Sequence, residues 1–393
     1  MQFAEIQEGD SRYIMHAYGR FPAALVKGKN ATVWDADGKK YIDFTSGIGV
    51  NCLGYSDPQW AAAVAAQAAQ IQHLSNLYYS PVTVKAAKAL CEAAGMQRVF
   101  FGNSGAEANE CAIKIARKYS ADKYGEGRSQ VVTLQNSFHG RTVTTLAATG
   151  QRVFHEKFLP LTEGFAYAEP KMESVRGAVN AHTCAVLIEL IQGEGGVHPM
   201  EKQFVQDLAA FCAQKDLLLL IDEVQTGIGR TGSFFCYQQY GITPDVVSAA
   251  KALGGGLPIG ACLVGSKCAQ VFAPGDHGST FGGNPVVCAG ALEVLSRVAQ
   301  PAFLEDVRKK GAYLRSELEK LPNVESVRGL GMMLGAKPAA GEPGKIAAAC
   351  VDAGLLVLTA KDVLRFLPPL TISKAEMDEG LAILRQVLQG FAG

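Results

Sequence analysis

The feature that most limits the fold is a series of short, uninterrupted apolar runs along the middle of the chain. Alanine-rich or amphipathic stretches separate several of them, and the runs lie at residues 98–101, 131–134, 185–190, 217–221, 246–249 and 262–264. A strand that is apolar without alternation is buried on both faces, as in a parallel sheet covered by helices. We therefore predict a large α/β domain over residues 46–289.

The two ends of the chain have a different pattern of apolar and polar residues. Asp37 and Gly38 separate two alternating runs, which predicts a β-hairpin within residues 31–44. A further strand is expected near residues 324–327. Cap residues or helical patterning predict helices at residues 57–73, 80–95, 291–299, 305–321 and 374–388. Residues 1–45 and 290–393 are expected to combine into a smaller α+β domain.

Charge and cysteine content exclude several classes of protein. Lys and Arg together number 37, as do Asp and Glu, so neither nucleic acid nor an anionic membrane is an expected partner. The ten cysteines contain no C-x-x-C pair and are expected to be reduced and mostly buried. Residues 1–13 lack the apolar core of a secretion signal, and the apolar runs are too short to span a bilayer. We expect a soluble, cytoplasmic protein.

A glycine-containing turn joins the first apolar run to a helix. In "FFGNSGAEANECAIKIARK", residues 100–118, the strand ends at Phe101 and the turn leads through Ser104, Gly105 and Ala106 into the helix. The free amides of a helix N-terminus can bind an anion such as phosphate. An ordinary capped turn explains the same residues, and taken alone it is the better explanation.

Asp222 and Lys251 follow two of the buried runs. Asp222 ends the run in "LLLLIDEV", and a buried carboxylate is costly without a cationic partner, which a protonated pyridine nitrogen would supply. Lys251 comes about one strand–helix–strand unit later, before three glycines. Both side chains can then reach one crevice at the carboxyl edge of the sheet. A structural ion pair for Asp222 and a solvated surface position for Lys251 are the alternatives.

The segment "NSFHGRT", residues 136–142, follows another run. Phe138 can stack on a planar ring, and Arg141 can bind a carboxylate through two of its guanidinium nitrogens. A core aromatic and a surface arginine are equally ordinary explanations. We assign no metal ligand.

Two glycine motifs are rejected as nucleotide sites. Gly227, Gly229 and Gly232 match G-x-G-x-x-G, but they do not directly follow a strand, and the acidic residue expected about 20 positions later is missing. Residues 260–267 resemble a P-loop, but Ser266 precedes Lys267, which reverses the required order.

Taken together, these stretches resemble the class III (ornithine-type) aminotransferases of fold type I, and most of all the acetylornithine aminotransferases. The resemblance covers nearly the whole chain. The matching stretches are "SNLYYS", "GNSGAEANE", "FHGRT", "IQGEGG", "IDEVQTGIGRTG", "KALGGGLPIGA", "STFGGNP" and "LRFLPPL". The implied fold has a mostly parallel seven-stranded sheet flanked by helices, with a smaller α+β domain built from both chain ends.

The resemblance also implies pyridoxal 5'-phosphate as cofactor, held covalently by Lys251 and paired through its ring nitrogen with Asp222, the two catalytic residues. Gly105 and Ala106 would bind the phosphate, and Phe138 and Val224 would cover the two ring faces. The full implied cofactor set is Ser104, Gly105, Ala106, Phe138, Asp222, Val224, Gln225, Lys251 and Thr280, with Thr280 reaching the phosphate across a homodimer interface. Implied substrate contacts are Arg141, Glu194, Ser279 and Arg365, with Glu194 masking Arg365 at times.

The implied reaction moves the terminal amino group of N-acetyl-L-ornithine to 2-oxoglutarate, a step of arginine biosynthesis. Gly47 and Ile48 stand where ornithine-specific relatives tend to carry a tyrosine, which favours a substrate with a blocked α-amine. The sequence departs from the family pattern at two places, which make the assignment to a subgroup less specific. It has Glu189-Leu190 in place of Glu-Pro, and its "GYSDP" lacks the usual histidine. Ornithine, succinylornithine, succinyl-diaminopimelate and 4-aminobutyrate transamination, aminomutase activity, and cofactor binding without turnover stay open as alternatives.

Overall fold

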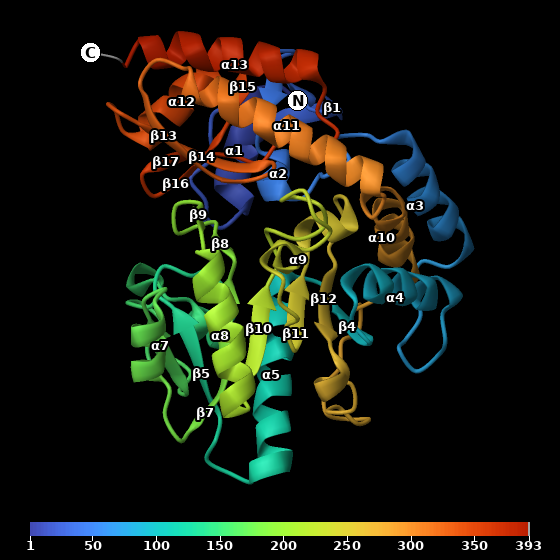
Figure 1. Ribbon diagram of the computed structural model, residues 1–393. Coiled ribbons are helices and arrows are strands. Elements are labelled where there is room, and N and C mark those ends of the chain that lie inside the picture. The colour runs from blue at the N-terminus through green and yellow to red at the C-terminus, as the bar shows by residue number, and fades with distance from the viewer. Residues whose placement is uncertain (392–393) are drawn as a thin grey trace.

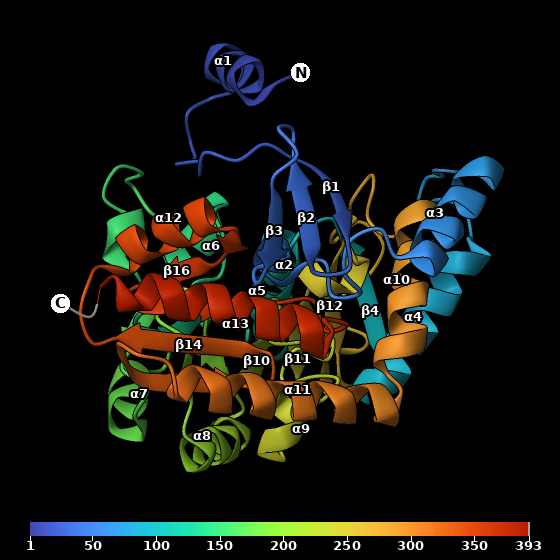
Figure 2. The same ribbon diagram turned by 90° about the horizontal axis from the view of Figure 1, so that it is seen from above.

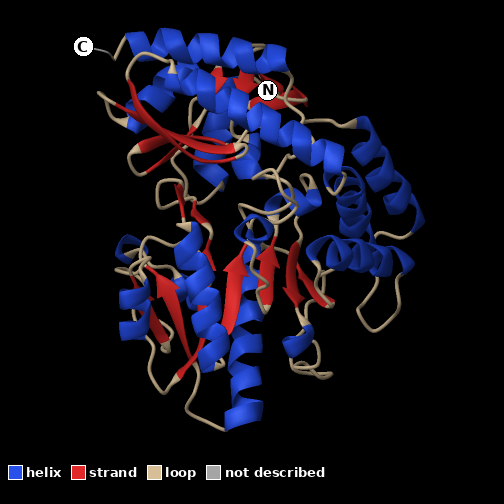
Figure 3. Ribbon diagram, viewed as in Figure 1, coloured by secondary structure: helices blue, strands red, loops and turns tan. Residues whose placement is uncertain are grey.

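A seven-stranded sheet forms the centre of the molecule in the computed structural model, which describes residues 1–391 (Figures 1 and 3). The strand order is β4-β12-β11-β10-β7-β5-β6. Neighbouring strands from β11 to β6 are parallel, and β12 runs antiparallel to both of its neighbours. The bounds are β4 (Arg98–Gly102), β5 (Gln130–Leu134), β6 (Phe165–Ala168), β7 (Thr183–Glu189), β10 (Leu218–Asp222), β11 (Val246–Ala249) and β12 (Gly260–Val264). This confirms the predicted mostly parallel sheet.

Both faces of the sheet are covered, which explains the unbroken apolar runs. Every residue of β7 and β10 is buried. Along β10, Leu218 and Leu220 share a core cluster with residues of α5 (Gly105–Tyr124), whereas Leu219 and Ile221 share the other with residues of α8 (Lys202–Lys215). Alternate side chains of one strand therefore stabilise two helix layers.

The strand β6 was not marked by an apolar run. It lies at one edge of the sheet beside β5 alone, and its sequence "FAYA" has only Ala168 fully buried. An edge strand with a half-exposed face does not need continuous apolar residues, so the pattern that identified the other six strands is weak here.

The two ends of the chain meet in a second sheet, in the order β1-β2-β3-β15. The strands β1 (Leu25–Lys29), β2 (Thr32–Asp35) and β3 (Lys40–Asp43) include the predicted hairpin, and β3 pairs in parallel with β15 (Leu355–Leu356). A third sheet has the order β13-β14-β17-β16, with bounds β13 (Val324–Leu330), β14 (Met333–Pro338), β16 (Leu358–Ala360) and β17 (Val363–Phe366). The division into two domains at residues 45 and 290 stays a prediction.

The predicted helices are present. Asp57 and Ser80 cap α3 (Pro58–Gln70) and α4 (Pro81–Ala94), each followed by proline at the first helical position. Asn284 caps α10 (Pro285–Val298) in the same way, so this helix starts six residues earlier than predicted. The remaining helices are α1 (Phe3–Tyr13), α2 (Ser46–Gly49), α6 (Val143–Ala148), α7 (Met172–Ala178), α9 (Tyr237–Tyr240), α11 (Pro301–Glu319), α12 (Pro343–Ala353) and α13 (Lys374–Gln389). Short pieces complete the chain: the strands β8 (Ile191–Gln192) and β9 (His198–Pro199), and the 3-10 turns Arg152–Phe154, Lys251–Gly254 and Ser266–Cys268.

The first helix stands away from the body of the molecule, as Figure 2 shows. No residue of α1 is buried, and Tyr13, Met15 and Tyr18 in and after it are at least three-quarters exposed. Over residues 1–391, no single helix is long and apolar enough to cross a membrane. The pair α10 and α11 meets that criterion only when the two are joined, and they are bent by 75° at their junction.

Candidate active site

A cavity of about 460 Å³ lies at the carboxyl ends of the parallel strands. Nine of the residues singled out from the sequence line it: Ser104, Gly105, Ala106, Phe138, Arg141, Asp222, Val224, Gln225 and Lys251. Glu194, Ser279, Thr280 and Arg365 are outside its lining. The fold therefore brings the predicted catalytic and cofactor residues together, with Thr280 as the exception.

The N-terminus of α5 forms one end of the cavity. Ser104 caps the helix by accepting a hydrogen bond from the Glu107 amide at 3.2 Å. Among residues 1–391, the amides of Gly105 and Ala106 have no hydrogen-bond acceptor, and both residues line the cavity. A Cβ on Gly105 would lie 2.6 Å from Val224 Cγ1, so only glycine lets the helix approach this closely. Two free amides and the helix dipole suit an anion.

The Asp222 carboxylate faces the same cavity and is only 4% exposed. Its Oδ2 accepts hydrogen bonds from Asn109 Nδ2 at 2.7 Å and His139 Nδ1 at 2.8 Å, and its Oδ1 accepts one from the Val224 amide at 3.0 Å. No lysine or arginine within residues 1–391 lies within 4.0 Å of it. A cation inside the cavity would therefore supply a partner that the protein lacks.

Lys251 comes two residues after the end of β11 and has a left-handed backbone, with φ of 45°. Burial lowers the pKa of its amine, although Asp222 and Glu194 act in the opposite direction. The described part of the chain offers this amine neither a hydrogen bond nor an ion pair. An unpartnered lysine with a lowered pKa is suited to act as a nucleophile and as a base.

Arg141 is exposed at the edge of the cavity. Its guanidinium carbon lies 5.5 Å from the Phe138 ring centroid and 4.2 Å from that of Phe154. No carboxylate within residues 1–391 pairs with it, which leaves its donors for a ligand. The two aromatic rings limit how the side chain can move.

Glu194 and Arg365 form an ion pair next to the cavity. Arg365 Nη1 lies 2.5 Å from Glu194 Oε1 and donates a second hydrogen bond to Gln225 Oε1 at 3.2 Å. Arg365 is 3% exposed, and its buried Nε has no partner in the described chain. The two side chains therefore meet in this structure, and whether the pair opens stays a prediction.

Ser279 and Thr280 lie outside the cavity. Ser279 Oγ accepts hydrogen bonds from Asn103 Nδ2 at 3.2 Å and from the Gly282 amide at 3.0 Å. Thr280 is exposed, and the following Phe281 is 60% exposed. Neither Ser279 nor Thr280 reaches the cavity of its own chain, so the roles implied for them depend on a second copy of the chain.

Sequence reasoning missed four polar residues of the cavity: Asn103, Asn109, His139 and Glu189. Asn109 lies four residues after Gly105, on the same face of α5, and that spacing is a usable signal. His139 is adjacent to Phe138. Glu189 ends β7 beside Asp222, as the strand register shows, and burial and the charge of Asp222 raise its carboxyl pKa well above the usual value.

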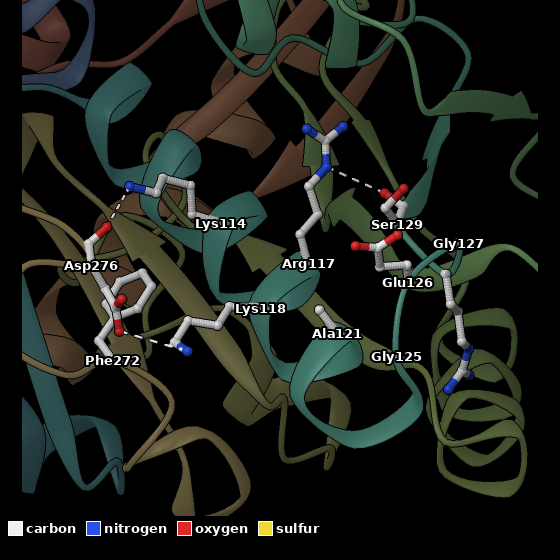
Figure 4. Close-up of a pocket in the computed structure, with 11 residues that line it drawn as sticks. Lys114, Arg117, Lys118, Ala121, Gly125, Glu126, Gly127, Ser129, Phe272 and Asp276 are labelled. Carbon is white, nitrogen blue, oxygen red and sulfur yellow. Dashed lines mark hydrogen bonds and ion pairs between the residues drawn. The ribbon is translucent and has the colours of Figure 1, made fainter.

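A second cavity, of about 440 Å³, lies along the far half of α5 and lacks such a set of groups (Figure 4). Its lining is rich in cations, but these are already engaged. Arg117 donates to the main-chain oxygen of Ser129 at 3.3 Å, and Lys118 pairs with Asp122 at 3.0 Å. It is therefore a weaker candidate for chemistry than the cavity around Lys251.

Comparisons with known proteins agree with this choice. A family model described as "Aminotransferase class-III" matches residues 13–388. The acetylornithine aminotransferase of Haemophilus ducreyi is 50% identical over 98% of both chains, and that of Caldanaerobacter subterraneus is 46% identical over 96% of this chain and 98% of its own. Among solved structures, the N-acetylornithine aminotransferase of Stenotrophomonas maltophilia has a TM-score of 0.84 at 36% identity, covering 98% of both chains. The ornithine aminotransferase of Toxoplasma gondii has a TM-score of 0.94 at 30% identity, covering 99% of this chain and 96% of its own.

Proposed function

The chain belongs to the class III aminotransferases, and from that premise we propose that it acts on N-acetyl-L-ornithine. The terminal amino group of this donor passes to 2-oxoglutarate, and the products are N-acetyl-L-glutamate semialdehyde and L-glutamate. The observation that carries the choice of donor is that the Haemophilus and Caldanaerobacter relatives, which align over nearly the full chain, are both acetylornithine aminotransferases. The fold is that of the fold type I aminotransferases.

The proposed cofactor is pyridoxal 5'-phosphate, and the cavity fits it at three points. Free amides at Gly105 and Ala106 suit the phosphate, the Asp222 carboxylate suits a protonated ring nitrogen, and the unpartnered Lys251 amine suits the carbonyl carbon. When bound, this cofactor supplies a carbonyl that condenses with amines and a ring that accepts an electron pair. Phe138 and Val224 are proposed to hold the ring between them, with Gln225 at its oxygen.

The chain's own part in the chemistry centres on Lys251. Its Nζ would hold the cofactor covalently and, when free, would accept and return a proton at the amino-bearing carbon of the substrate. A lowered amine pKa keeps a fraction of Nζ unprotonated and able to accept that proton. The Asp222 carboxylate would stabilise a positive charge on the ring nitrogen.

Arg141 is proposed to bind the α-carboxylate of both substrates, because its guanidinium is exposed at the cavity and has no carboxylate partner among residues 1–391. Gly47 and Ile48 carry no hydroxyl that could bind a free α-amine, which agrees with an acetylated donor.

Arg365 is proposed to bind the second carboxylate of glutamate or 2-oxoglutarate. With the acylated donor, Glu194 neutralises it through the observed 2.5 Å ion pair. With a dicarboxylate, the pair opens, and the ligand's stronger binding to the open arrangement drives the change.

The active unit is proposed to be a homodimer in which Ser279 and Thr280 serve the neighbouring cavity. Exposed apolar side chains support this, since Leu77, Tyr78 and Tyr79 are 86%, 72% and 100% exposed in the single chain. A cluster of this kind on a protein surface marks a contact with another chain.

A panel of amino donors tests the proposal, with 2-oxoglutarate as acceptor and glutamate formation as the readout. N-acetyl-L-ornithine should give the highest kcat/KM, above ornithine, succinylornithine, succinyl-diaminopimelate and 4-aminobutyrate. A higher value for any of these would replace the donor, and no turnover with any of them, in protein that retains cofactor, would leave only cofactor binding. Lys251→Ala should abolish turnover of the best donor.

A further inference from the structure

Four buried side chains form a continuous hydrogen-bond network behind the Asp222 carboxylate. Ser248 Oγ donates to Asn109 Oδ1 at 2.6 Å, and Asn109 Nδ2 donates to Asp222 Oδ2 at 2.7 Å. The same Nδ2 donates to the main-chain oxygen of His139 at 2.8 Å, while His139 Nδ1 lies 2.8 Å from Asp222 Oδ2. All four residues are at most 4% exposed.

The network admits one orientation of the Asn109 amide. Turned over, its oxygen would face two acceptors, the Asp222 carboxylate and the His139 carbonyl, with no donor between them. In the observed orientation both amide hydrogens are used, and the Ser248 hydroxyl supplies the one donor that the amide oxygen needs. Ser248 therefore completes a set of contacts that would otherwise leave a buried acceptor unpaired.

The two oxygens of Asp222 become unequal as a result. Oδ2 accepts from two side chains, whereas Oδ1 accepts only from the Val224 amide at 3.0 Å. Since a carboxylate oxygen has two lone pairs, Oδ1 keeps one for a cation in the cavity. Both donors to Oδ2 also stabilise the ionised form of the carboxylate and not the neutral form.

We propose that Ser248 and Asn109 are positioning residues that hold the Asp222 carboxylate in place and leave its Oδ1 for the ring nitrogen of the cofactor. The proposal rests on the cofactor assignment made under the proposed function. Ser248 lies on β11, just before Lys251, and Asn109 lies on α5, one turn after the proposed phosphate site. The network thus joins the three elements that would hold the cofactor.

Cofactor binding to the apoprotein provides the test, measured by tryptophan fluorescence during titration with pyridoxal 5'-phosphate at a series of pH values. Ser248→Ala should raise the dissociation constant about 3- to 10-fold at neutral pH, and Asn109→Leu about 10- to 100-fold. On acidification, both variants should lose affinity at a higher pH than wild type, because hydrogen bonds that favour a charged carboxylate are weakened. The other titratable groups that face Asp222 are His139, Glu189, Glu223 and Lys251, and they are the same in all three proteins. A purely structural role would lower the melting temperature without moving this pH profile.

Ser120→Ala is the matched control. Ser120 is buried on α5, like Asn109, but its Oγ has no hydrogen-bond partner within residues 1–391, so its removal should change neither affinity nor pH profile. If wild type binds the cofactor and Ser248→Ala behaves like Ser120→Ala, the inference is wrong and the proposed function stands. If wild type does not bind the cofactor, the proposed function itself fails.

Discussion

At the scale of single residues, Glu223 carries a buried carboxyl that takes no part in the proposed chemistry. It follows Asp222, accepts hydrogen bonds from Thr226 Oγ1 at 2.6 Å and the Tyr237 amide at 2.8 Å, and is 1% exposed. Burial raises the pKa of its carboxyl to about 7 from an ordinary value of 4.5. The folded state therefore holds this proton more tightly than the unfolded state does.

The sign of the effect on stability follows from that difference. Glu223 should lower the free energy of unfolding as pH rises from about 4.5 to about 7, by an upper limit of about 3 kcal/mol. Glu223→Gln keeps an oxygen for the Tyr237 amide, lets its NH2 group donate to the Thr226 hydroxyl, and removes the charge. It should therefore flatten this dependence and stabilise the apoprotein above neutral pH. Urea unfolding of both apoproteins at acidic and alkaline pH measures this, and parallel pH curves would contradict it.

The ion pair of Glu194 and Arg365 leads to a prediction about the two half-reactions. Glu194→Ala should slow the N-acetylornithine half-reaction more than the glutamate half-reaction. Without Glu194, the Arg365 guanidinium has no counter-charge and faces the uncharged reacting end of the acylated donor. Arg365→Ala should do the reverse, by about tenfold to a hundredfold for a hydrogen bond between charged groups. Single-turnover measurements of each half-reaction separate the two, and equal losses in both halves for both variants would leave the pair as a fixed scaffold.

Sequence reasoning found the residues whose chemistry is unusual for their surroundings, and it missed those that support them. Asp222 and Lys251 stand out because a charge is costly in an apolar segment. Asn109 and His139 give no such signal, because an amide on a helix and a histidine in a turn are common in any protein. Only the fold brings both side chains into contact with the Asp222 carboxylate. Contacts between distant segments are what the linear pattern leaves out.

At the scale of elements, the segment α2 is a left-handed turn. Ser46, Gly47, Ile48 and Gly49 all have positive φ, between 43° and 80°. Glycine adopts this conformation freely, but a β-branched residue does so only at a cost of about 1–2 kcal/mol. No local sequence pattern predicted this turn, because Ile48 is a poor residue for it; the surrounding contacts hold it, including Ser46 Oγ donating to the Leu367 oxygen at 2.6 Å.

Replacing Ile48 by glycine should relieve the strain. Ile48 is 42% exposed, so little burial is lost, and the apoprotein should gain up to about 1 kcal/mol after the greater freedom of glycine in the unfolded chain is subtracted. Ile71→Gly is the control: Ile71 is 45% exposed but extended, with φ of −157°, and its replacement should give no gain. Equal changes in urea unfolding for the two variants would show that the turn carries no strain.

At the scale of the whole molecule, the segment of residues 77–79 is the place to test assembly. Tyr79→Asp puts a charge at a fully exposed aromatic position and should shift sedimentation from dimer toward monomer. Since Thr280 is proposed to reach the partner's phosphate site, cofactor retention should fall together with dimer content on dilution. Val26→Asp, at a 63% exposed position on β1, should leave both unchanged. A fully active monomer at assay concentration would overturn the shared site.

The parallel pairing of β3 with β15 sets an order on how the chain can mature as it leaves the ribosome. The seven strands of the central sheet lie in one stretch of the sequence, interrupted only by the short β8–β9 pair, and can assemble while the rest is still being made. Ile42 of β3, by contrast, can form its pairing with Leu355 only after residue 355 has been synthesised. Until then the main-chain groups along one edge of β3 are unpaired, and such an edge can pair with strands of other chains and cause aggregation. The nascent protein therefore holds an incomplete terminal sheet through most of its synthesis.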